Sequence, residues 1–262
     1  MNTFQDKVIW ITGSSSGLGA EIARQSAMQG AKVILSARNV EKLNQLCDEL
    51  ENSSDHLVLP LDLEKSENFP ELVQTVIDRY GRIDALYNNG GISQRAEASS
   101  TDLEIDRRIM EINYFGNVAL SKAVLPIFQK QQSGHYIVIS SIAGKFGFFL
   151  RSAYSASKHA LHGFYESLML EEEKNNINVT IACPGKINTD ISVNALNESG
   201  SATGVMDDNQ VSGMSPKECV KQLLSAVKKN KKEVLIGNKE IKAVLLKRFF
   251  PKLFWRVIKK QK

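Results

Sequence analysis

The sequence predicts a single α/β domain of the Rossmann type, in which a doubly wound parallel sheet carries helices on both faces. Short apolar runs alternate with longer segments of helical periodicity along most of the chain, an order typical of parallel α/β sheets. The runs are apolar almost throughout, as expected for strands that helices cover on both sides. The length of 262 residues and the 42% of hydrophobic residues fit one domain with a sizeable core.

Four strands and three helices are expected in the first part of the chain. The runs KVIWIT and KVILSA are rich in β-branched residues, and each precedes a longer segment with apolar residues at helical spacing. In chain order, the elements are a strand at Lys7–Thr12, a helix at Leu18–Gln29, a strand at Lys32–Ala37, a helix at Glu41–Leu50, a strand at His56–Leu61, a helix at Phe69–Tyr80 and a strand at Ile83–Asn88.

The alternation continues with longer helices. The elements are a helix at Asp102–Gln131, a strand at His135–Ser140 (HYIVIS), a helix at Ala153–Lys174 and a strand at Asn178–Cys183 (NVTIAC). The segment Asn194–Met214 is polar and Gly-rich, and we expect a mobile loop that covers the active site. The domain is expected to span residues 1–241, and residues 242–262 to form a basic amphipathic tail.

Composition excludes several classes of protein. The three cysteines, Cys47, Cys183 and Cys219, are widely spaced and form no CxxC motif, which favours a reducing, cytoplasmic compartment. No uncharged apolar run approaches the roughly 20 residues that span a bilayer, and the start of the chain shows no signal-peptide pattern. His159 and His162 have no cysteine or clustered acid beside them in the sequence, so no metal site is expected.

A Gly-rich turn, TGSSSGLG at 12–19, joins the first strand to the first helix. Its glycines allow a tight turn and let backbone N–H groups and a helix N-terminus approach a pyrophosphate. The spacing is GxxxGxG rather than GxGxxG, and a purely structural turn would look similar. The position between a strand and a helix at the head of an alternating fold favours phosphate binding.

The end of the second strand indicates which dinucleotide would bind. Where NAD-binding units usually place an acid for the ribose 2′-hydroxyl, the chain has Ser36-Ala37-Arg38. Arg38 suits a 2′-phosphate, so NADP(H) is favoured over NAD(H), the alternative being a solvated arginine. Asp62, just after the third strand, would bond the adenine amino group, the alternative being an Asp that only starts a turn. The candidate dinucleotide-binding residues in this half are Gly13, Ser15, Ser16, Gly17, Leu18, Gly19, Arg38, Asp62, Leu63, Asn89 and Gly90.

The candidate chemistry lies on the helix after the fifth strand. Tyr154 and Lys158 stand four residues apart and share one helix face. An unperturbed tyrosine has a pKa of about 10, and a nearby ammonium lowers it. The pair would then donate a proton to a developing alkoxide or remove one from an alcohol. Ser141, at the end of the fifth strand, would bind the same substrate oxygen.

Together these motifs resemble the short-chain dehydrogenase/reductase family. The matching segments are TGSSSGLG at 12–19, NNGG at 88–91, EINYFG around Asn113, ISS at 139–141, YSASK at 154–158 and PGKINT at 184–189. The resemblance implies a tetrad of Asn113, Ser141, Tyr154 and Lys158. Tyr154 is implied to be the acid/base, Lys158 to bind the nicotinamide ribose and lower the tyrosine pKa, and Asn113 to hold a water. The residues implied to line the nicotinamide are Tyr154, Lys158, Pro184, Gly185, Ile187 and Thr189.

The strings NNGGISQR, YSASKHAL and KEVLIG resemble the branch of that family called dehydrogenase/reductase member seven. That resemblance implies reduction of lipophilic carbonyls, such as steroids and retinoids, with NADPH. Phe146, Phe148 and Phe149 lie between Ser141 and Tyr154, and they fit an apolar substrate pocket or, equally, a core or subunit interface.

The expected function is hydride transfer between NADP(H) and a secondary alcohol or ketone. The alternative is a non-catalytic NADP(H)-sensing protein on the same scaffold. The resemblance also implies a homodimer or homotetramer, formed through the helices at Asp102–Gln131 and Ala153–Lys174.

The last 21 residues, Lys242–Lys262, contain eight basic residues and no acid. Basic residues recur at Arg248, Lys252, Arg256 and Lys260, beside the apolar stripes Leu245, Phe249, Leu253, Val257 and Leu246, Phe250, Phe254, Ile258. This spacing predicts an amphipathic helix broken near Pro251. Such a tail either lies on a membrane surface or docks on the domain, a partner subunit or the substrate pocket. The interleaved aromatic residues disfavour nucleic-acid binding.

Overall fold

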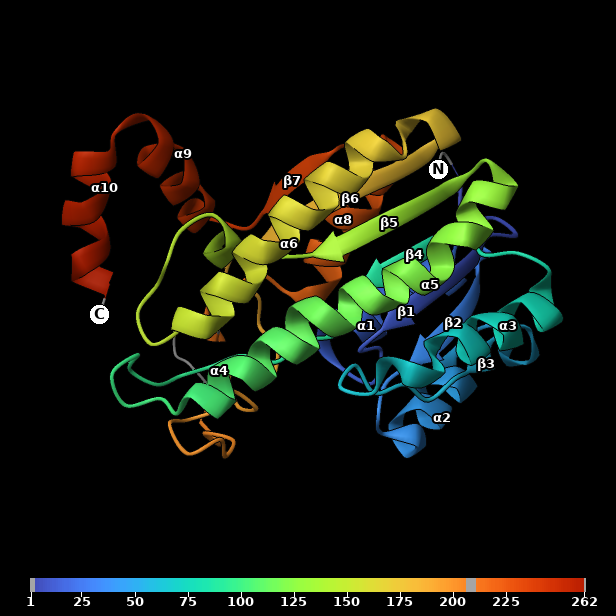
Figure 1. The fold of residues 1–262 in the computed structure, drawn as a ribbon, viewed down its shortest axis with the longest axis horizontal. Helices are drawn as coiled ribbons and strands as arrows, with labels where there is room; N and C mark the ends of the chain where they lie inside the picture. The colour runs from blue at the N-terminus through green and yellow to red at the C-terminus, as the bar shows by residue number, and fades with distance from the viewer. Residues whose placement is uncertain (1–2, 206–210, 262) are drawn as a thin grey trace.

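The computed structural model describes residues 3–205 and 211–261, and its centre is one seven-stranded parallel sheet (Figure 1). The strand order is β3-β2-β1-β4-β5-β6-β7, so the order reverses between β1 and β4. The strands are β1 Val8–Thr12, β2 Lys32–Ser36, β3 Leu57–Val58, β4 Ala85–Asn88, β5 Gly134–Ile139, β6 Ile177–Pro184 and β7 Glu233–Ile236. In sheets of this kind, the crevice at the reversal point is where ligands bind.

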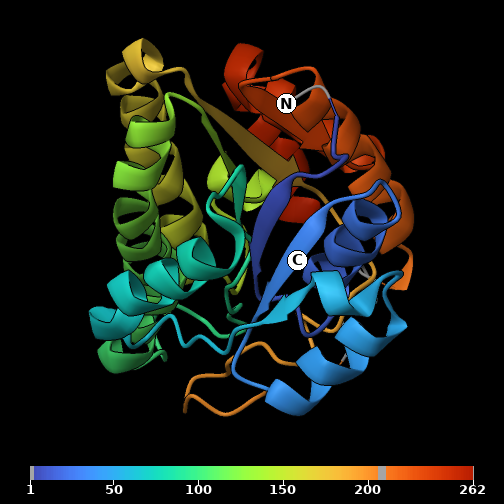
Figure 2. The same ribbon diagram turned by 90° about the vertical axis from the view of Figure 1, so that its right-hand side faces the viewer.

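Helices cover both faces of this sheet, as the end-on view in Figure 2 shows. One face carries α1 Gly17–Ala27, α2 Val40–Glu49 and α8 Pro216–Lys228, and the other carries α3 Phe69–Tyr80, α4 Leu103–Met110, α5 Gly116–Gln131 and α6 Ser152–Glu171. Alternate residues of β1 enter the two cores: Ile9 and Ile11 pack with the first set, Val8 and Trp10 with the second. The predicted doubly wound α/β fold is therefore confirmed.

Three parts of this architecture differ from the sequence prediction. The prediction named neither β7 nor α8, and the expected strand at His56–Leu61 shortens to the two residues of β3. The helix expected over Asp102–Gln131 is interrupted at Glu111–Phe115 by a π-helical turn, η3, between α4 and α5. Short 3₁₀ turns complete the chain: η1 Ser53–Asp55, η2 Ser66–Asn68, η4 Ile142–Gly144, η5 Glu173–Asn175, η6 Lys239–Ile241 and η7 Lys259–Gln261.

The described residues of the segment Asn194–Met214 are held to the domain more firmly than expected. Leu196 is buried with Ile105 and Ile109 of α4, and its backbone N–H donates to the Ser93 carbonyl at 2.9 Å. Residues 206–210 lie outside the described residues. Among the described residues of this segment, none lines the cavity at the strand ends. The expectation that they cover the active site is therefore wrong for this part.

The tail instead reaches the cavity. It forms two helices, α9 Lys242–Phe249 and α10 Pro251–Ile258, which stand beyond the carboxyl ends of the strands in Figure 1. The break at Phe250 and Pro251 agrees with the sequence, since proline cannot continue the hydrogen bonding of α9. Phe254 and Ile258 are buried against Phe146. Within residues 3–205 and 211–261, no helix is long and apolar enough to cross a membrane.

Candidate active site

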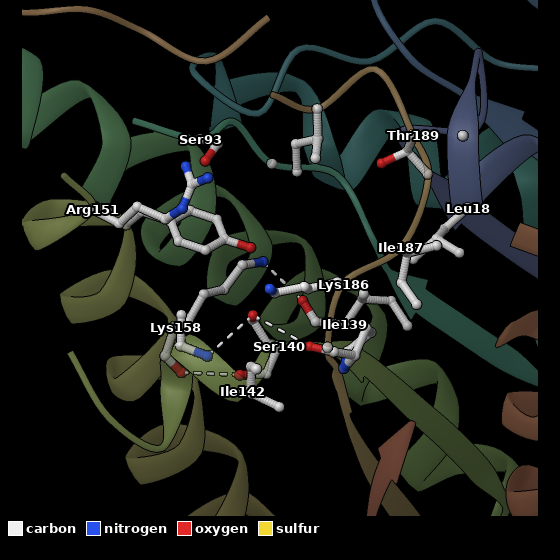
Figure 3. A pocket seen from close by; sticks show the side chains of 18 of the residues that line it. Leu18, Ser93, Ile139, Ser140, Ile142, Arg151, Lys158, Lys186, Ile187 and Thr189 are labelled. Carbon is white, nitrogen blue, oxygen red and sulfur yellow. Dashed lines mark hydrogen bonds between the residues drawn. The ribbon is translucent and has the colours of Figure 1, made fainter. Parts of the chain in front are cut away.

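One cavity of about 1090 Å³ lies at the carboxyl ends of the central strands. It takes in the Gly-rich turn, the end of β2, the ends of β4 and β5, the start of α6 and the segment after β6. Every site residue predicted from the sequence lines it, except Gly19 and Asn113. In Figure 3, the Lys158 side chain extends from α6 toward Ile139, and the side chain of Arg151, the residue just before α6, extends toward Ser93.

The Gly-rich turn is built as a close backbone cradle. Gly13 and Gly17 have φ angles of +64° and +54°, which favour glycine. A Cβ atom on Gly19 would lie 2.2 Å from the Gly13 carbonyl oxygen, so only glycine lets α1 begin there. The Asn89 amide holds the turn by donating to the carbonyl oxygens of Thr12 at 2.9 Å and Gly13 at 3.2 Å.

The start of α1 is open to an anion. The Ser16 side chain makes no capping hydrogen bond to the first turn of α1, and the first turn contains no acid. A helix N-terminus of this kind binds phosphate groups through backbone N–H groups. The glycine cradle and the uncapped helix therefore fit the pyrophosphate of a dinucleotide.

The end of the cavity next to β2 contains two charged groups, Arg38 and Asp62. Arg38 follows β2, its side chain is 60% exposed, and an Nη1 atom lies 3.9 Å from a Glu64 carboxylate oxygen. Glu64 also accepts from Arg108 at 3.1 Å. Asp62 accepts from the Glu64 backbone N–H at 3.1 Å, so one of its oxygens already has a partner. Sequence reasoning did not identify Glu64, which lies beside Arg38 but does not line the cavity.

The candidate acid/base, Tyr154, lies in the cavity wall with Ser141 beside it. Burial raises the pKa of Tyr154, whereas a hydrogen bond with Ser141 and the charge of Arg151 lower it. Ser141 Oγ also accepts from the Ala143 N–H at 3.1 Å. The side chains of Ser141 and Tyr154 therefore converge on one point of the cavity, where they can bind the same ligand oxygen.

Lys158 is buried beneath this point, and its position differs from the expectation. Its ammonium donates to the Ile139 carbonyl oxygen at 2.8 Å and lies 5.7 Å from the centre of the Tyr154 ring. Burial lowers the pKa of Lys158 to about 8. The expected lowering of the Tyr154 pKa by Lys158 is not found, because the causes that lower it are Ser141 and Arg151.

The depressed pKa of Lys158 leads to a stability prediction. Burial lowers the pKa from 10.5 to about 8, so between these pH values the unfolded lysine holds a proton that the folded one has lost. The free energy of unfolding should therefore rise with pH across this window, by about 3 kcal/mol from this residue. Urea unfolding of the wild type and of Lys158→Met at pH 7 and pH 10 measures it. The variant should gain stability relative to the wild type at pH 7 and lose that advantage at pH 10; parallel pH profiles would contradict the prediction.

Asn113 lies in the π-helical turn and links two elements. Its Oδ1 accepts from the Ile92 N–H at 2.8 Å, and its Nδ2 donates to the Ile92 carbonyl at 2.9 Å and to Ser157 Oγ at 3.0 Å. A π turn often marks a functional position in a helix. Here it aims the amide at the loop after β4, so in this structure Asn113 holds Ile92 and α6 rather than facing the cavity.

The segment after β6 closes the cavity opposite α6. Pro184, Gly185, Ile187 and Thr189 all line it. Glu240, which the sequence analysis missed, holds this segment by accepting from the N–H groups of Lys186 at 3.0 Å and Asn238 at 3.1 Å. A Cβ on Gly185 would lie 2.3 Å from that carboxylate, so glycine is required for the contact.

Apolar side chains form the outer end of the cavity. Phe146 and Phe148 line it, and Phe146 packs edge-on against Phe254 of α10 at 5.1 Å between ring centres. Phe149 does not line the cavity and is 36% exposed. The tail contributes residues that the sequence analysis did not assign to the site: Leu245, Leu246, Phe249, Phe250, Val257 and Ile258. The amphipathic spacing of the tail was the only signal for them.

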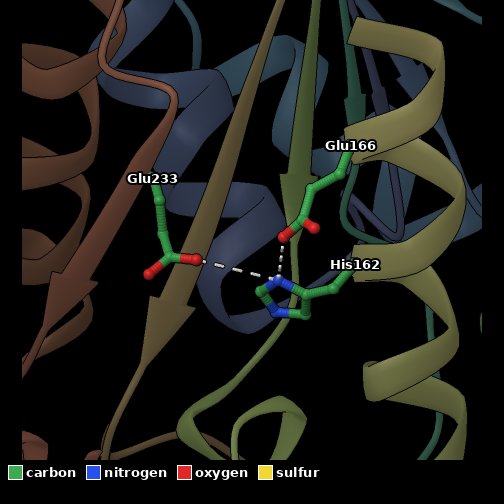
Figure 4. A group of neighbouring side chains, drawn as sticks. All are labelled: His162, Glu166 and Glu233. Atoms are coloured by element: carbon green, nitrogen blue, oxygen red, sulfur yellow. Dashed lines mark ion pairs between the residues drawn. The ribbon is translucent and has the colours of Figure 1, made fainter. Parts of the chain in front are cut away.

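A second polar cluster joins α6 and β7 (Figure 4). His162 Nδ1 lies 3.5 Å from Glu166 and 3.8 Å from Glu233, which corrects the expectation that no acid clusters beside this histidine. Burial and the charge of Lys145 lower the pKa of His162. The Lys145 ammonium lies 3.2 Å from His162 Nδ1 and pairs with Glu233. Because the Lys145 ammonium already pairs with one of the two carboxylates, Glu233, we assign the cluster as a polar network that ties α6 to β7.

Comparison with known proteins identifies the family. The profile described as short chain dehydrogenase matches residues 7–199. A protein of Drosophila melanogaster, "Dehydrogenase/reductase SDR family protein 7-like", is 40% identical over 99% of this chain and 82% of its own length. "Dehydrogenase/reductase SDR family member 7B" of Mus musculus is 41% identical over 97% of this chain and 80% of its own. The chain belongs to the short-chain dehydrogenase/reductase family, and is an oxidoreductase by that membership.

Solved structures share the fold over 90–97% of the chain. A short-chain dehydrogenase/reductase from Burkholderia phymatum in complex with NAD superposes with a TM-score of 0.85 at 20% identity, covering 97% of this chain and 96% of that one. A short-chain dehydrogenase from Streptomyces avermitilis gives a TM-score of 0.84 at 28% identity, covering 94% and 93%. An alcohol dehydrogenase from Thermococcus sibiricus complexed with 5-hydroxy-NADP gives 0.76 at 23% identity, covering 90% and 97%.

Proposed function

We propose that this protein is an NADP(H)-dependent oxidoreductase that interconverts a lipophilic ketone and its secondary alcohol. The observation that carries the proposal is a single cavity in which the glycine cradle, the Ser141–Tyr154–Lys158 group and an apolar outer wall are continuous. A site that only bound a dinucleotide would have no need of a buried lysine beneath a hydroxyl pair. This arrangement of residues therefore favours catalysis over a role in sensing NADP(H).

The residues around the reacting oxygen have separate roles in the proposed reaction. A bound nicotinamide dinucleotide supplies the hydride for reduction or accepts it for oxidation. Tyr154 gives a proton to the developing alkoxide, and Ser141 donates a hydrogen bond that fixes the oxygen for this transfer. Arg151, which lowers the pKa of Tyr154, favours ionisation of the phenol in the reverse direction. Lys158 holds the end of β5 through the Ile139 carbonyl and so positions Ser141.

The preference for NADP(H) rests on the end of β2. The run Ser36-Ala37-Arg38 contains no carboxylate, and Arg38 lines the cavity. A guanidinium binds a phosphate in a planar fork, whereas a carboxylate at this place would repel it. The solved relatives carry both kinds of dinucleotide by name, so they do not decide the choice.

The lipophilic substrate class rests on the outer wall of the cavity. Phe146 and Phe148 come from the segment after Ser141, and apolar residues of α9 and α10 pack beside them and line the same end of the cavity. Apolar lining with a few convergent polar groups is typical of sites that bury most of a small ligand. A bulky, mostly apolar carbonyl compound fits this distribution, since its one polar atom would lie at Tyr154 and Ser141.

The test is the oxidation of NADPH, with NADH in parallel, over a panel of steroid, retinal, quinone and aromatic carbonyls. We expect turnover that is faster with NADPH and that rises with the apolar size of the carbonyl. Tight NADPH binding without turnover of any panel member would contradict the catalytic proposal. Faster turnover with NADH would contradict only the assignment of Arg38 as the residue that selects NADP(H), and would leave the catalytic proposal in place.

A further inference from the structure

The tail exposes an unusual concentration of large apolar side chains. Of the fifteen large hydrophobic residues that are exposed among those described, six lie between residues 245 and 257. They are Leu245 (53% exposed), Phe249 (64%), Phe250 (62%), Leu253 (48%), Trp255 (51%) and Val257 (43%). We call α9, α10 and the turn between them the tail hairpin. A cluster of this kind on one element marks a contact surface rather than chance exposure.

The exposed residues are not a core face that failed to pack. Phe254 and Ile258 of α10 are already buried against Phe146, and Lys247 donates to the Lys145 carbonyl oxygen at 2.9 Å. The tail hairpin is therefore anchored on the domain by one side. Leu253 and Trp255 of α10 lie outside the cavity lining and are about half exposed.

Positive charge surrounds these apolar residues. Arg248, Lys252 and Arg256 are exposed between them, and Lys259 and Lys260 follow in the next turn. Residues 242–262 contain no acid, and in the described part of the chain none of these five cations forms an ion pair. Exposed aromatic residues ringed by unpaired cations match a surface that is apolar inside and anionic at its boundary.

We propose that the tail hairpin docks the protein on an anionic lipid bilayer. Aromatic and aliphatic side chains enter the boundary between head groups and acyl chains, and the cations face the anionic head groups. Each helix has only eight residues, so the contact is with the surface of the bilayer. A second copy of this chain is the poorer partner, because a twofold contact would bring the same unpaired cations face to face.

Docking of this kind also sets where the cavity opens. Leu245, Phe249 and Val257 belong both to the exposed surface of the tail hairpin and to the outer end of the cavity. A continuous apolar path therefore leads from the docked surface to the inner cavity. This step rests on the proposed function: a lipophilic carbonyl dissolved in the bilayer would enter along the hairpin without crossing water.

The two tryptophans of the chain provide a direct readout. Trp10 is fully buried and donates to Ser36 Oγ at 2.8 Å, whereas Trp255 is 51% exposed on the tail hairpin. Vesicles of phosphatidylcholine with about one third phosphatidylserine should shift the emission to shorter wavelength, and brominated acyl chains should quench it. Trp255→Phe should abolish both changes. Vesicles of phosphatidylcholine alone should bind about ten-fold more weakly, and added salt should weaken binding to the anionic vesicles.

Sedimentation with the same vesicles tests the surface by substitution. The double variant Leu253→Ser with Trp255→Ser should lose most of the binding, and so should the triple variant in which Arg248, Lys252 and Arg256 become Glu. The matched controls are Phe115→Ser, an equally exposed aromatic on η3, and Lys217→Glu with Lys221→Glu on α8, which should bind as the wild type does.

The results separate this inference from the proposed function. No association with anionic vesicles, or undiminished binding by the double variant, overturns it. Self-association of the lipid-free protein that shifts the Trp255 emission also overturns it, in favour of a second copy. Turnover of the carbonyl panel with NADPH and without vesicles is measured in parallel: if no panel member is turned over while vesicles bind, the proposed function fails and the docking stands.

Discussion

Tyr154→Phe is expected to lower kcat for carbonyl reduction by about 10³-fold, within the range that a positioned general acid contributes. The variant removes only the phenol hydroxyl, the group whose pKa is lowered by Ser141 and Arg151. Because the ring stays, the cavity keeps its shape. We therefore expect NADPH affinity and Tm close to the wild-type values. Steady-state kinetics, cofactor titration and thermal unfolding of the two proteins measure the three quantities.

The matched control is Tyr114→Phe, since Tyr114 packs edge-on against Phe115 and Phe164 and does not line the cavity. Its kcat should change less than about two-fold, as for a surface substitution without a special role. Equal activity of Tyr154→Phe and the wild type would remove Tyr154 from the chemistry. Loss of activity together with loss of NADPH binding would show a structural role instead.

The sheet could be predicted from sequence as far as β6 because buried parallel strands are continuous apolar runs. The sequence did not predict β7, for a physical reason. It is an edge strand of four residues, Glu233 is exposed, Val234 and Leu235 are only half-buried, and a lysine-rich run precedes it. Its place is fixed by pairing with β6, a contact that leaves no periodic signal in so short a segment.

The inner part of the site could be predicted because its residues follow directly on strands or begin helices. The outer part depends on contacts between distant segments. Phe254 reaches Phe146 across more than a hundred residues, and Glu233 reaches His162 from the strand that was missed. Amphipathic spacing tells which face of the tail is apolar but not what that face contacts. The π turn at Asn113 could not be predicted either, since one inserted residue leaves the apolar spacing of a long helix nearly unchanged.

Removal of the Arg38 side chain should change cofactor choice. Arg38→Ser is expected to lower kcat/KM for NADPH by about 10- to 100-fold, the equivalent of one charge-assisted hydrogen bond. The value for NADH should stay within a few fold, because its adenosine ribose carries no phosphate for Arg38 to bind. Initial rates with the two cofactors, at a fixed concentration of the carbonyl identified from the panel, give the ratio.

A substitution at Glu64 should change the cofactor preference in the opposite direction. Its carboxylate lies 3.9 Å from Arg38 and pairs with Arg108, so it competes for the guanidinium that would hold a 2′-phosphate. Glu64→Gln should therefore raise the NADPH preference by up to about five-fold, in line with the small free energy of an exposed ion pair. Arg24→Ser is the matched control, because Arg24 forms a similarly exposed pair with Glu49 away from the cavity. If Arg38→Ser weakened both cofactors equally, Arg38 would only support the end of β2, and the preference for NADP(H) would lose its physical basis.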